Sequence, residues 1–199
     1  KSILDNILNS EGIIMVYTQY IYGGIIPIAL ALEELGFVNS TGNNLFEAPP
    51  SNTIDYKNFT SMKEQDNNDS YVATYSVISG EGSGLSPKNK NEILKLTNSD
   101  NVDGKHIKVV LITQAAAEGL DFKYIRQVHI LEPWYNMNRI EQIIGRAVRT
   151  CSHSKLRFEE RNVQIFMHGS LLSKKKREAL DLYVYRFAEK KARKIGKIT

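Results

Sequence analysis

The first apolar run of the chain predicts a buried β-strand that leads into a helix. Residues 12–18, GIIMVYT, are apolar without alternation, which is typical of a strand covered on both faces in a parallel sheet. The next periodic segment, about 25–35, has Pro27 in its first turn and Gly36 just past its end, as helices commonly do. The two segments together predict one strand-to-helix unit.

Similar units recur along the chain. We predict further strands at 71–79, 106–113, 127–133 and 162–169, and helices at about 86–96, about 138–149 and, as a basic C-terminal helix, within 173–199, with its periodic part ending near Lys194. For the helix near Asn138, Glu141 three residues on predicts a variant of the capping box. The alternation predicts an α/β fold with an open, mostly parallel sheet, helices on both faces, and ligands at the carboxyl ends of the strands.

The stretch 39–70 differs from the rest of the chain. It is rich in Asn, Ser and Asp, shows little periodicity, and is longer than an ordinary connection. We therefore expect either a surface insertion or a partly disordered segment, and we do not expect the function to centre there.

The segment RIEQIIGRAVR, residues 139–149, predicts an amphipathic helix with two different faces. An apolar stripe combines Ile140, Ile143, Ile144, Ala147 and Val148. The polar stripe on the other side carries Gln142, Arg146 and Arg149. Two guanidinium groups one turn apart favour an anion between them.

Composition and length are those of one globular domain covering residues 1–199, with 42% hydrophobic and 24% charged residues. The single cysteine, Cys151, excludes an internal disulfide, and neither a signal peptide nor an apolar run long enough for a membrane span is visible. We expect an intracellular, reducing compartment and no membrane partner. Because the chain opens with Lys1 and closes inside a helical pattern, we also expect a piece of a longer protein.

Charge is distributed unequally between the two parts of the chain. Residues 1–121 hold 8 Lys and Arg against 15 Asp and Glu, whereas residues 122–199 hold 18 against 7. The second part is therefore strongly basic, which suits a polyanion such as nucleic acid but is also compatible with an ordinary solvated face.

A candidate site follows the strand at 106–113. The segment TQAAAEGLD, residues 113–121, leaves the carboxyl end of that strand, with Gly119 allowing a tight turn and Asp121 offering a carboxylate. The arginine-bearing helix begins about twenty residues later and can reach the same edge of the sheet. A carboxylate suits a ribose hydroxyl and the guanidinium forks suit phosphate oxygens, so the pair predicts a nucleotide.

These residues carry a resemblance to the second RecA-like lobe of superfamily 2 helicases. QIIGRAVR matches the Q-x-x-G-R-x-x-R pattern of motif VI, and TQAAAEGLD matches the T-x-x-A-x-x-G-x-D pattern of motif V, in the same order. GIIMVYTQY looks like motif IV, so the resemblance covers about residues 10–169. The run from 125 to 153 is similar in particular to the helicase-like ATPases of large eukaryotic DNA viruses, the group that includes poxvirus early transcription factors.

The resemblance implies a role for each matching position. Arg149 would be the arginine finger, Arg146 a second contact to the γ-phosphate, and Gln142 a group that positions the phosphate or the attacking water. Nucleotide-binding positions would be Gly119, Asp121 and Gly145, where a glycine permits close approach to a neighbouring element or the nucleotide. Contacts to the nucleic-acid backbone would come from Thr113, Thr18 and Gln19.

The resemblance also implies partners outside this chain. No G-x-x-x-x-G-K-[ST] loop occurs in the 199 residues, so ATP and Mg²⁺ would be bound mainly by an N-terminal helicase lobe, and this chain alone would be inactive. Nucleic acid, with DNA favoured over RNA, and viral transcription proteins are the other expected partners. A viral protein of this group would act in transcription or replication, within the virion or the host cytoplasm or nucleus.

Several alternatives stay open. The lobe could be a degenerate helicase domain kept as a non-catalytic module that binds nucleic acid or transcription proteins. Trp134 and Tyr135 could stack on bases, although we favour the core for both. Cys151 and His153 have no second pair at metal spacing, so we expect no metal site. The final helix could face DNA or dock on another lobe.

Overall fold

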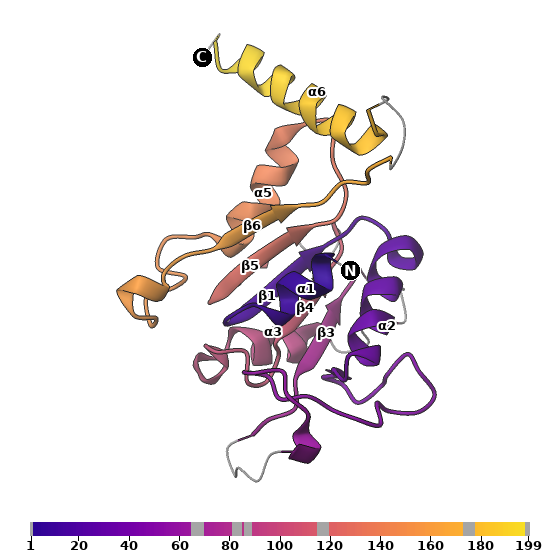
Figure 1. Cartoon of the computed structure of the whole chain (residues 1–199). Helices are drawn as coiled ribbons and strands as arrows, with labels where there is room; N and C mark the ends of the chain where they lie inside the picture. The colour runs from indigo at the N-terminus through magenta and orange to yellow at the C-terminus, as the bar shows by residue number, and fades with distance from the viewer. Residues whose placement is uncertain are drawn as a thin grey trace.

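The computed structural model describes residues 2–64, 70–80, 85, 89–114, 120–172 and 178–197. A six-stranded parallel sheet with strand order β2-β3-β4-β1-β5-β6 runs through the centre of the molecule (Figure 1). The strands are β1 (Ile13–Tyr17), β2 (Val38–Asn39), β3 (Thr74–Ile78), β4 (Val109–Ile112), β5 (Ile125–Ile130) and β6 (Gln164–Met167). All five predicted strands are confirmed, and β2 is an addition of two residues.

Helices cover both faces of this sheet, as expected. They are α1 (Ser2–Leu8), α2 (Ile26–Glu34), α3 (Asn89–Thr97), α5 (Met137–Ala147) and α6 (Leu180–Ile195), with a π-helical turn (Ile21–Ile25) leading into α2. Apolar residues of α1 and α2 share one buried cluster with the sheet, while those of α3 and α5 share a second cluster on the opposite face. The predicted α/β architecture, an open parallel sheet with helices on both faces, is therefore confirmed.

The central strand β1 belongs to both clusters because successive side chains of a strand point to opposite faces. Ile13, Met15 and Tyr17 join the cluster on the α5 side, and Ile14 and Val16 join the cluster on the α2 side. All five are at most 2% exposed. This double burial explains the uninterrupted apolar run in the sequence.

Two predicted helix starts are corrected by the structure. α6 begins at Leu180 rather than near residue 173, because Ala179 has an extended backbone (φ −68°, ψ 150°), while residues 173–177 lie outside the described residues. The N-cap of α5 is Asn136, and the capping box expected for Asn138 and Glu141 is wrong. The Asn136 side chain makes no cap hydrogen bond and accepts one from Lys191 of α6 instead.

The described part of the polar stretch, 39–64, is mostly irregular and is held by two carboxylates. Asp55 is 4% exposed and accepts hydrogen bonds from the backbone of Lys57 and Asn58. Glu33 of α2 accepts from the backbone of Leu45 and from the Tyr75 hydroxyl. Because the buried carboxylate oxygens accept backbone hydrogen bonds from the segment, they fix the course of its backbone.

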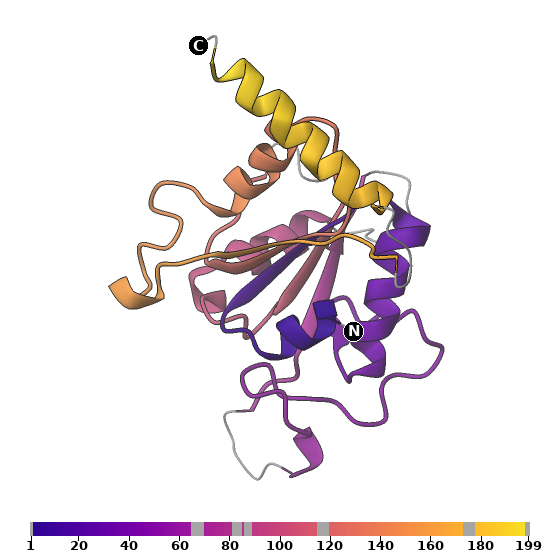
Figure 2. The ribbon, with the colours of Figure 1, turned by 45° about the horizontal axis from the view of Figure 1, so that its top comes forward.

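β6 is the edge strand of the sheet next to β5, and it pairs with no other strand among the described residues. Its Ile165 and Met167 are 43% and 52% exposed. After β6 the chain turns into α6, which crosses the carboxyl-end side of the sheet beyond α5 (Figure 2). The Tyr185 hydroxyl of α6 donates to the carbonyl of His168 at 3.0 Å, which fastens α6 to the end of β6.

Candidate functional site

The candidate residues lie at the carboxyl ends of two strands and along α5, which packs beside the sheet. Thr18 directly follows β1, Thr113 directly follows β4, and α5 follows β5 after a short connection. Because all the strands are parallel, their carboxyl ends lie at the same edge, where ligands of open α/β sheets bind. Thr18 and Thr113 therefore lie at the predicted edge. Asp121 and the arginines do not share it: α5 runs back along the sheet, and the turn that carries Arg149 is bonded to the start of β5, where the Tyr124 amide donates to the Ser152 carbonyl.

Asp121 lies between the two arginines of the polar stripe. Its Oδ2 is 2.7 Å from Arg149 Nη1, and its Oδ1 is 3.9 Å from Arg146 Nη1. Arg146 also donates to the carbonyl of Leu120 at 3.4 Å. The side chains of Asp121, Arg146 and Arg149 are 57%, 25% and 43% exposed, so both guanidinium groups remain accessible to a further anion. The anion expected between the two forks is, in this structure, a carboxylate of the chain itself.

The apolar face of α5 fixes the direction of this polar stripe. Ile140, Ile143 and Ala147 are at most 5% exposed, and Ile144 is half-buried against the same cluster. Val148, expected in the buried stripe, is 48% exposed. That expectation is wrong because the helix ends at Ala147, where the backbone leaves the helical path.

Arg149 consequently lies just beyond the end of α5 and not within it. Val148 has φ −107° and ψ 84°, which breaks the helix one residue before Arg149. The Ser152 hydroxyl donates to the Arg149 carbonyl at 2.8 Å, and the Arg149 amide lies 3.3 Å from the same hydroxyl. The Arg149 backbone is thus held on both sides, while its side chain projects from a turn.

Two further motif positions lie on α5 near the arginines. Gln142 is exposed and lines a cleft together with Arg146. A Cβ atom placed on Gly145 would meet nothing within 4 Å. The close approach that we expected between Gly145 and a neighbouring element is therefore not found within the described chain. Gly119 lies outside the described residues.

The residues predicted to contact nucleic acid are largely buried in the lobe. Thr18 is 1% and Thr113 is 6% exposed, whereas Gln19 is half-buried. The Thr18 hydroxyl donates to Glu132 Oε1 at 2.5 Å, and the Gln19 amide donates to Oε2 of the same carboxylate at 3.1 Å. Glu132 thus ties the end of β1 to the end of β5, and the Thr18 hydroxyl faces this carboxylate.

Sequence reasoning missed Arg139, which joins three segments at the same edge. Its guanidinium carbon lies 3.9 Å from the centroid of the Trp134 ring, and Nη2 donates to the Tyr17 hydroxyl at 3.3 Å. It also donates to Gln114, within motif V. Burial raises the pKa of Tyr17, and the hydrogen bond from Arg139 opposes that rise. Arg139 therefore links the beginnings of motifs V and VI to the end of β1.

The aromatic pair beside Arg139 divides between core and surface. Trp134 is half-buried and packs against the α5-side cluster, as expected. Tyr135 is 56% exposed, so its assignment to the core is wrong. Trp134 and Arg139 line a cleft of about 470 Å³ whose opposite wall is formed by Ala188, Lys191, Ala192 and Ile195 of α6.

No group of three His, Cys, Asp or Glu side chains able to hold a metal ion occurs in the described parts of the chain. His153 is committed to protein contacts, with Nε2 2.6 Å from the carbonyl of Ile125 and Nδ1 2.7 Å from the Ser152 hydroxyl. None of the helices that the structure describes has the length and apolar character needed to cross a membrane.

A protein-family model matches the part of the chain that contains both candidate motifs, 113–121 and 142–149. The model of the helicase conserved C-terminal domain matches residues 37–151, more than half of the chain. A termination factor NPH-I homolog of African swine fever virus is 31% identical over 183 residues, covering 86% of this chain and 26% of that protein. A putative ATP-dependent RNA helicase of Acanthamoeba polyphaga mimivirus is 31% identical over 168 residues, covering 83% of this chain and 24% of that protein.

A solved structure gives the same architecture. The crystal structure of the C-terminal part of the Fun30 ATPase domain aligns with a TM-score of 0.56 at 11% identity, covering 94% of this chain and 44% of that one. At such low identity the likeness concerns the fold alone. The chain spans about a quarter of the length of the two viral relatives.

Proposed function

Because this chain belongs to the helicase conserved C-terminal domain family, we propose that it is the second RecA-like lobe of a nucleic-acid-dependent ATPase, a superfamily 2 helicase or translocase. The observation that carries the proposal is the cluster of Asp121, Arg146 and Arg149 beside Gln142. ATP and Mg²⁺ are held mainly by an N-terminal lobe, since this sequence has no phosphate-cradling loop of the G-x-x-x-x-G-K-[ST] type.

The two arginines act on the transferred phosphoryl group. When water attacks the γ-phosphorus and the bond to the β-phosphate oxygen breaks, negative charge spreads over the phosphate oxygens. Arg149 is the arginine finger that stabilises this charge, and Arg146 makes a second contact to the γ-phosphate. Gln142 positions the phosphate or the water.

Asp121 keeps the two guanidinium groups ready in the absence of nucleotide. Its ion pairs with Arg149 and Arg146 are partly exposed, so they are weak enough to be exchanged for phosphate contacts when the lobes close. The released carboxylate is then free to accept a hydrogen bond from a ribose hydroxyl. Lobe closure on ATP and reopening after hydrolysis move the nucleic acid.

The nucleic acid lies along the carboxyl ends of β1 and β4. We assign backbone contacts to Gln19, Thr113 and Thr18; the buried Thr113 is reached only if its side chain becomes exposed, and Thr18 only if its hydroxyl leaves Glu132. The strongly basic second part of the chain attracts a polyanion without reading its sequence. One viral relative is a termination factor homolog and another is a putative RNA helicase, which supports a role in viral transcription. RNA is therefore an alternative to DNA as the bound polymer.

The proposal is tested by ATP turnover of the full-length protein, measured with DNA, with RNA and without nucleic acid. We expect turnover to rise with one of the two polymers. The 199-residue chain alone should hydrolyse no ATP because the phosphate-binding loop is elsewhere. Appreciable turnover by the purified chain, or a full-length protein without any turnover, would contradict the proposal, and the second result would favour a non-catalytic binding module.

A further inference from the structure

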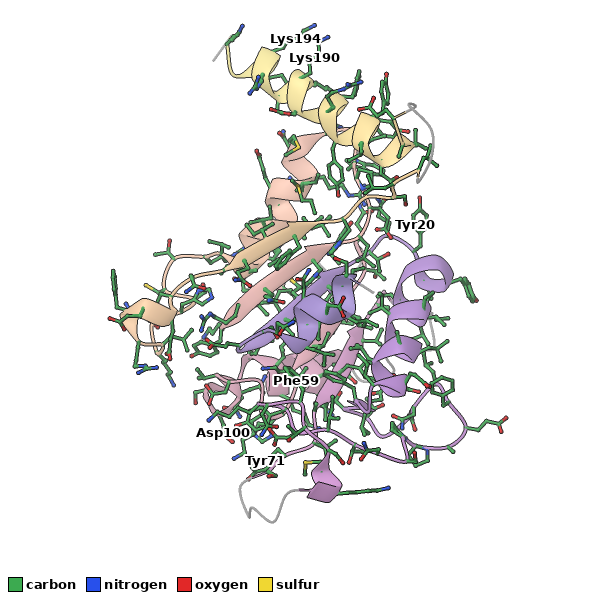
Figure 3. The ribbon with its side chains drawn as sticks, viewed as in Figure 1. Tyr20, Phe59, Tyr71, Asp100, Lys190 and Lys194 are labelled. Carbon is green, nitrogen blue, oxygen red and sulfur yellow. The ribbon has the colours of Figure 1, made fainter. Side chains whose placement is uncertain are left out.

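The outward face of α6 carries an aromatic and basic stripe that the motifs do not use. Tyr183, Phe187, Lys190 and Lys194 follow one another at i, i+4, i+7 and i+11, so they lie on one side of the helix. Tyr183 and Phe187 are 49% and 45% exposed, and both lysines are exposed. In Figure 3, Lys190 and Lys194 point away from the sheet.

The opposite face of α6 holds the helix on the lobe. Val184 and Ala188 are at most 5% exposed, and the Tyr185 hydroxyl donates to the His168 carbonyl. Lys191 reaches Asn136 at the start of α5. The stripe is therefore not the face that packs against the protein, and its exposure needs another explanation.

The lysines of the stripe differ from two arginines of α6 in having no acidic partner within the described part of the chain. Arg186 pairs with Glu178, and Arg193 pairs with Glu189. Neither Lys190 nor Lys194 has an acidic partner within 4 Å among the residues the structure describes. Two unneutralised ammonium groups thus extend the line of the aromatic pair.

The two exposed rings lie beside each other with similar orientations. Tyr183 and Phe187 are stacked, with ring centroids 6.3 Å apart and planes inclined by 22°. Exposed aromatic rings beside unpaired cations match the chemistry of single-stranded nucleic acid, whose bases stack on aromatic faces and whose phosphates bind cations. The stripe from Tyr183 to Lys194 extends about 16 Å along the helix axis, long enough for several nucleotides.

We propose that the outward stripe of α6, formed by Tyr183, Phe187, Lys190 and Lys194, is a second binding surface for single-stranded nucleic acid. Bases stack on Tyr183 and Phe187, and Lys190 and Lys194 bind the phosphates that follow. This surface is separate from the strand ends and from the arginine cluster, so it does not depend on ATP turnover. It rests on the proposed function only in taking nucleic acid as the partner.

The test is equilibrium binding of the 199-residue chain to fluorescent 20-nucleotide oligothymidine and oligouridine and to a 20-base-pair duplex, by anisotropy. Tyr183→Ser/Phe187→Ser should weaken single-strand binding at least tenfold and leave duplex binding within twofold, because only unstacked bases reach the rings. Lys190→Ala/Lys194→Ala should weaken binding to both and reduce the slope of log K against log salt for the single strand by about 1.4, from two phosphate contacts.

The matched control takes an exposed lysine and an exposed aromatic ring from the loop before β6. Phe158 is 81% exposed and Lys155 is exposed, so Lys155→Ala/Phe158→Ser removes similar groups away from α6 and should leave binding unchanged. Circular dichroism melting checks that each variant is folded.

Three results would overturn the proposal. One is an equal loss of single-strand and duplex binding in the aromatic variant, and another is the same loss in the control. The third is that the α6 variants keep their nucleic-acid affinity but lose binding to phosphatidylserine vesicles, which would make α6 a membrane-surface helix. None of these results bears on the arginine cluster, whose failure would appear in ATP turnover of the full-length protein.

Discussion

Arg149→Ala in the full-length protein should remove most of the nucleic-acid-stimulated ATP turnover. An arginine that stabilises charge on the transferred phosphoryl group contributes a factor of about 10³ to 10⁵, or about 4 to 7 kcal/mol of the activation barrier. Arg149 projects from the turn after α5, with its backbone fixed by Ser152, so the substitution removes the guanidinium without moving its neighbours. We expect kcat to fall at least a thousandfold.

The same substitution should hardly change stability. The side chains of Arg149 and Asp121 are 43% and 57% exposed, and ion pairs open to solvent contribute about 0.2 to 1 kcal/mol. The expected loss in the free energy of unfolding is therefore below about 1 kcal/mol, far less than the change in the barrier. A large loss of activity with a small loss of stability separates a catalytic arginine from a structural one.

Two further variants sharpen the comparison. Arg149→Lys keeps the charge but loses the planar fork that can contact two phosphate oxygens, so it should be almost as inactive as Arg149→Ala. Arg157 is the matched control, because it also forms an exposed ion pair, with Glu160, but lies in the loop before β6. Arg157→Ala should keep normal turnover.

The assay is release of phosphate at saturating ATP and nucleic acid, with urea unfolding of each variant in parallel. Turnover within threefold of the unsubstituted protein after Arg149→Ala would refute the reasoning. So would a loss of activity that Arg157→Ala reproduces, since the effect would then come from general charge rather than from this position.

Three other predictions concern stability and can be measured by urea unfolding. Ile143→Ala should cost about 2 to 5 kcal/mol, because this side chain is 5% exposed in the core below α5, and a smaller cost would mean that the helix is loosely packed. Burial lowers the pKa of His129 to about 4, so the neutral imidazole stabilises the fold above pH 6.5, and up to about 3 kcal/mol of the free energy of unfolding is lost as pH falls from 6.5 towards 4. His129→Asn should remove that part of the pH dependence of stability. An unchanged pH dependence in the variant would contradict the prediction. Tyr185→Phe should cost about 0.5 to 1.5 kcal/mol by leaving the His168 carbonyl without its donor, and no change would mean that α6 is not held there.

Most strands of the sheet could be predicted because each is a short apolar segment of the sequence. The apolar run at 12–18 is typical of a strand buried on both faces, and β1 confirms this interpretation. By contrast, β2 has only two residues, too few for any periodicity. The sequence also fails to mark the end of α5. Val148 fits the apolar spacing of a helix and was therefore predicted to be buried, but α5 ends at Ala147.

The site could be predicted as a set of residues but not as a set of contacts. The motifs identify Asp121, Arg146 and Arg149, yet no sequence pattern says that the carboxylate pairs with both arginines in the same conformation. Arg139 was missed because its partners, Tyr17 and Gln114, belong to segments far apart in the chain. Contacts of this kind are set by how strands are ordered in the sheet.

The outer edge of β6 has a consequence for how the lobe behaves at high concentration. A strand that ends a sheet presents unpaired N–H and C=O groups, and Ile165 and Met167 add apolar side chains that are about half exposed. Charged residues or prolines usually protect such an edge, but QIFM contains neither. Two copies can therefore associate edge to edge, and a Lys substitution at Ile165 is a direct way to keep the isolated lobe soluble without touching the arginine cluster.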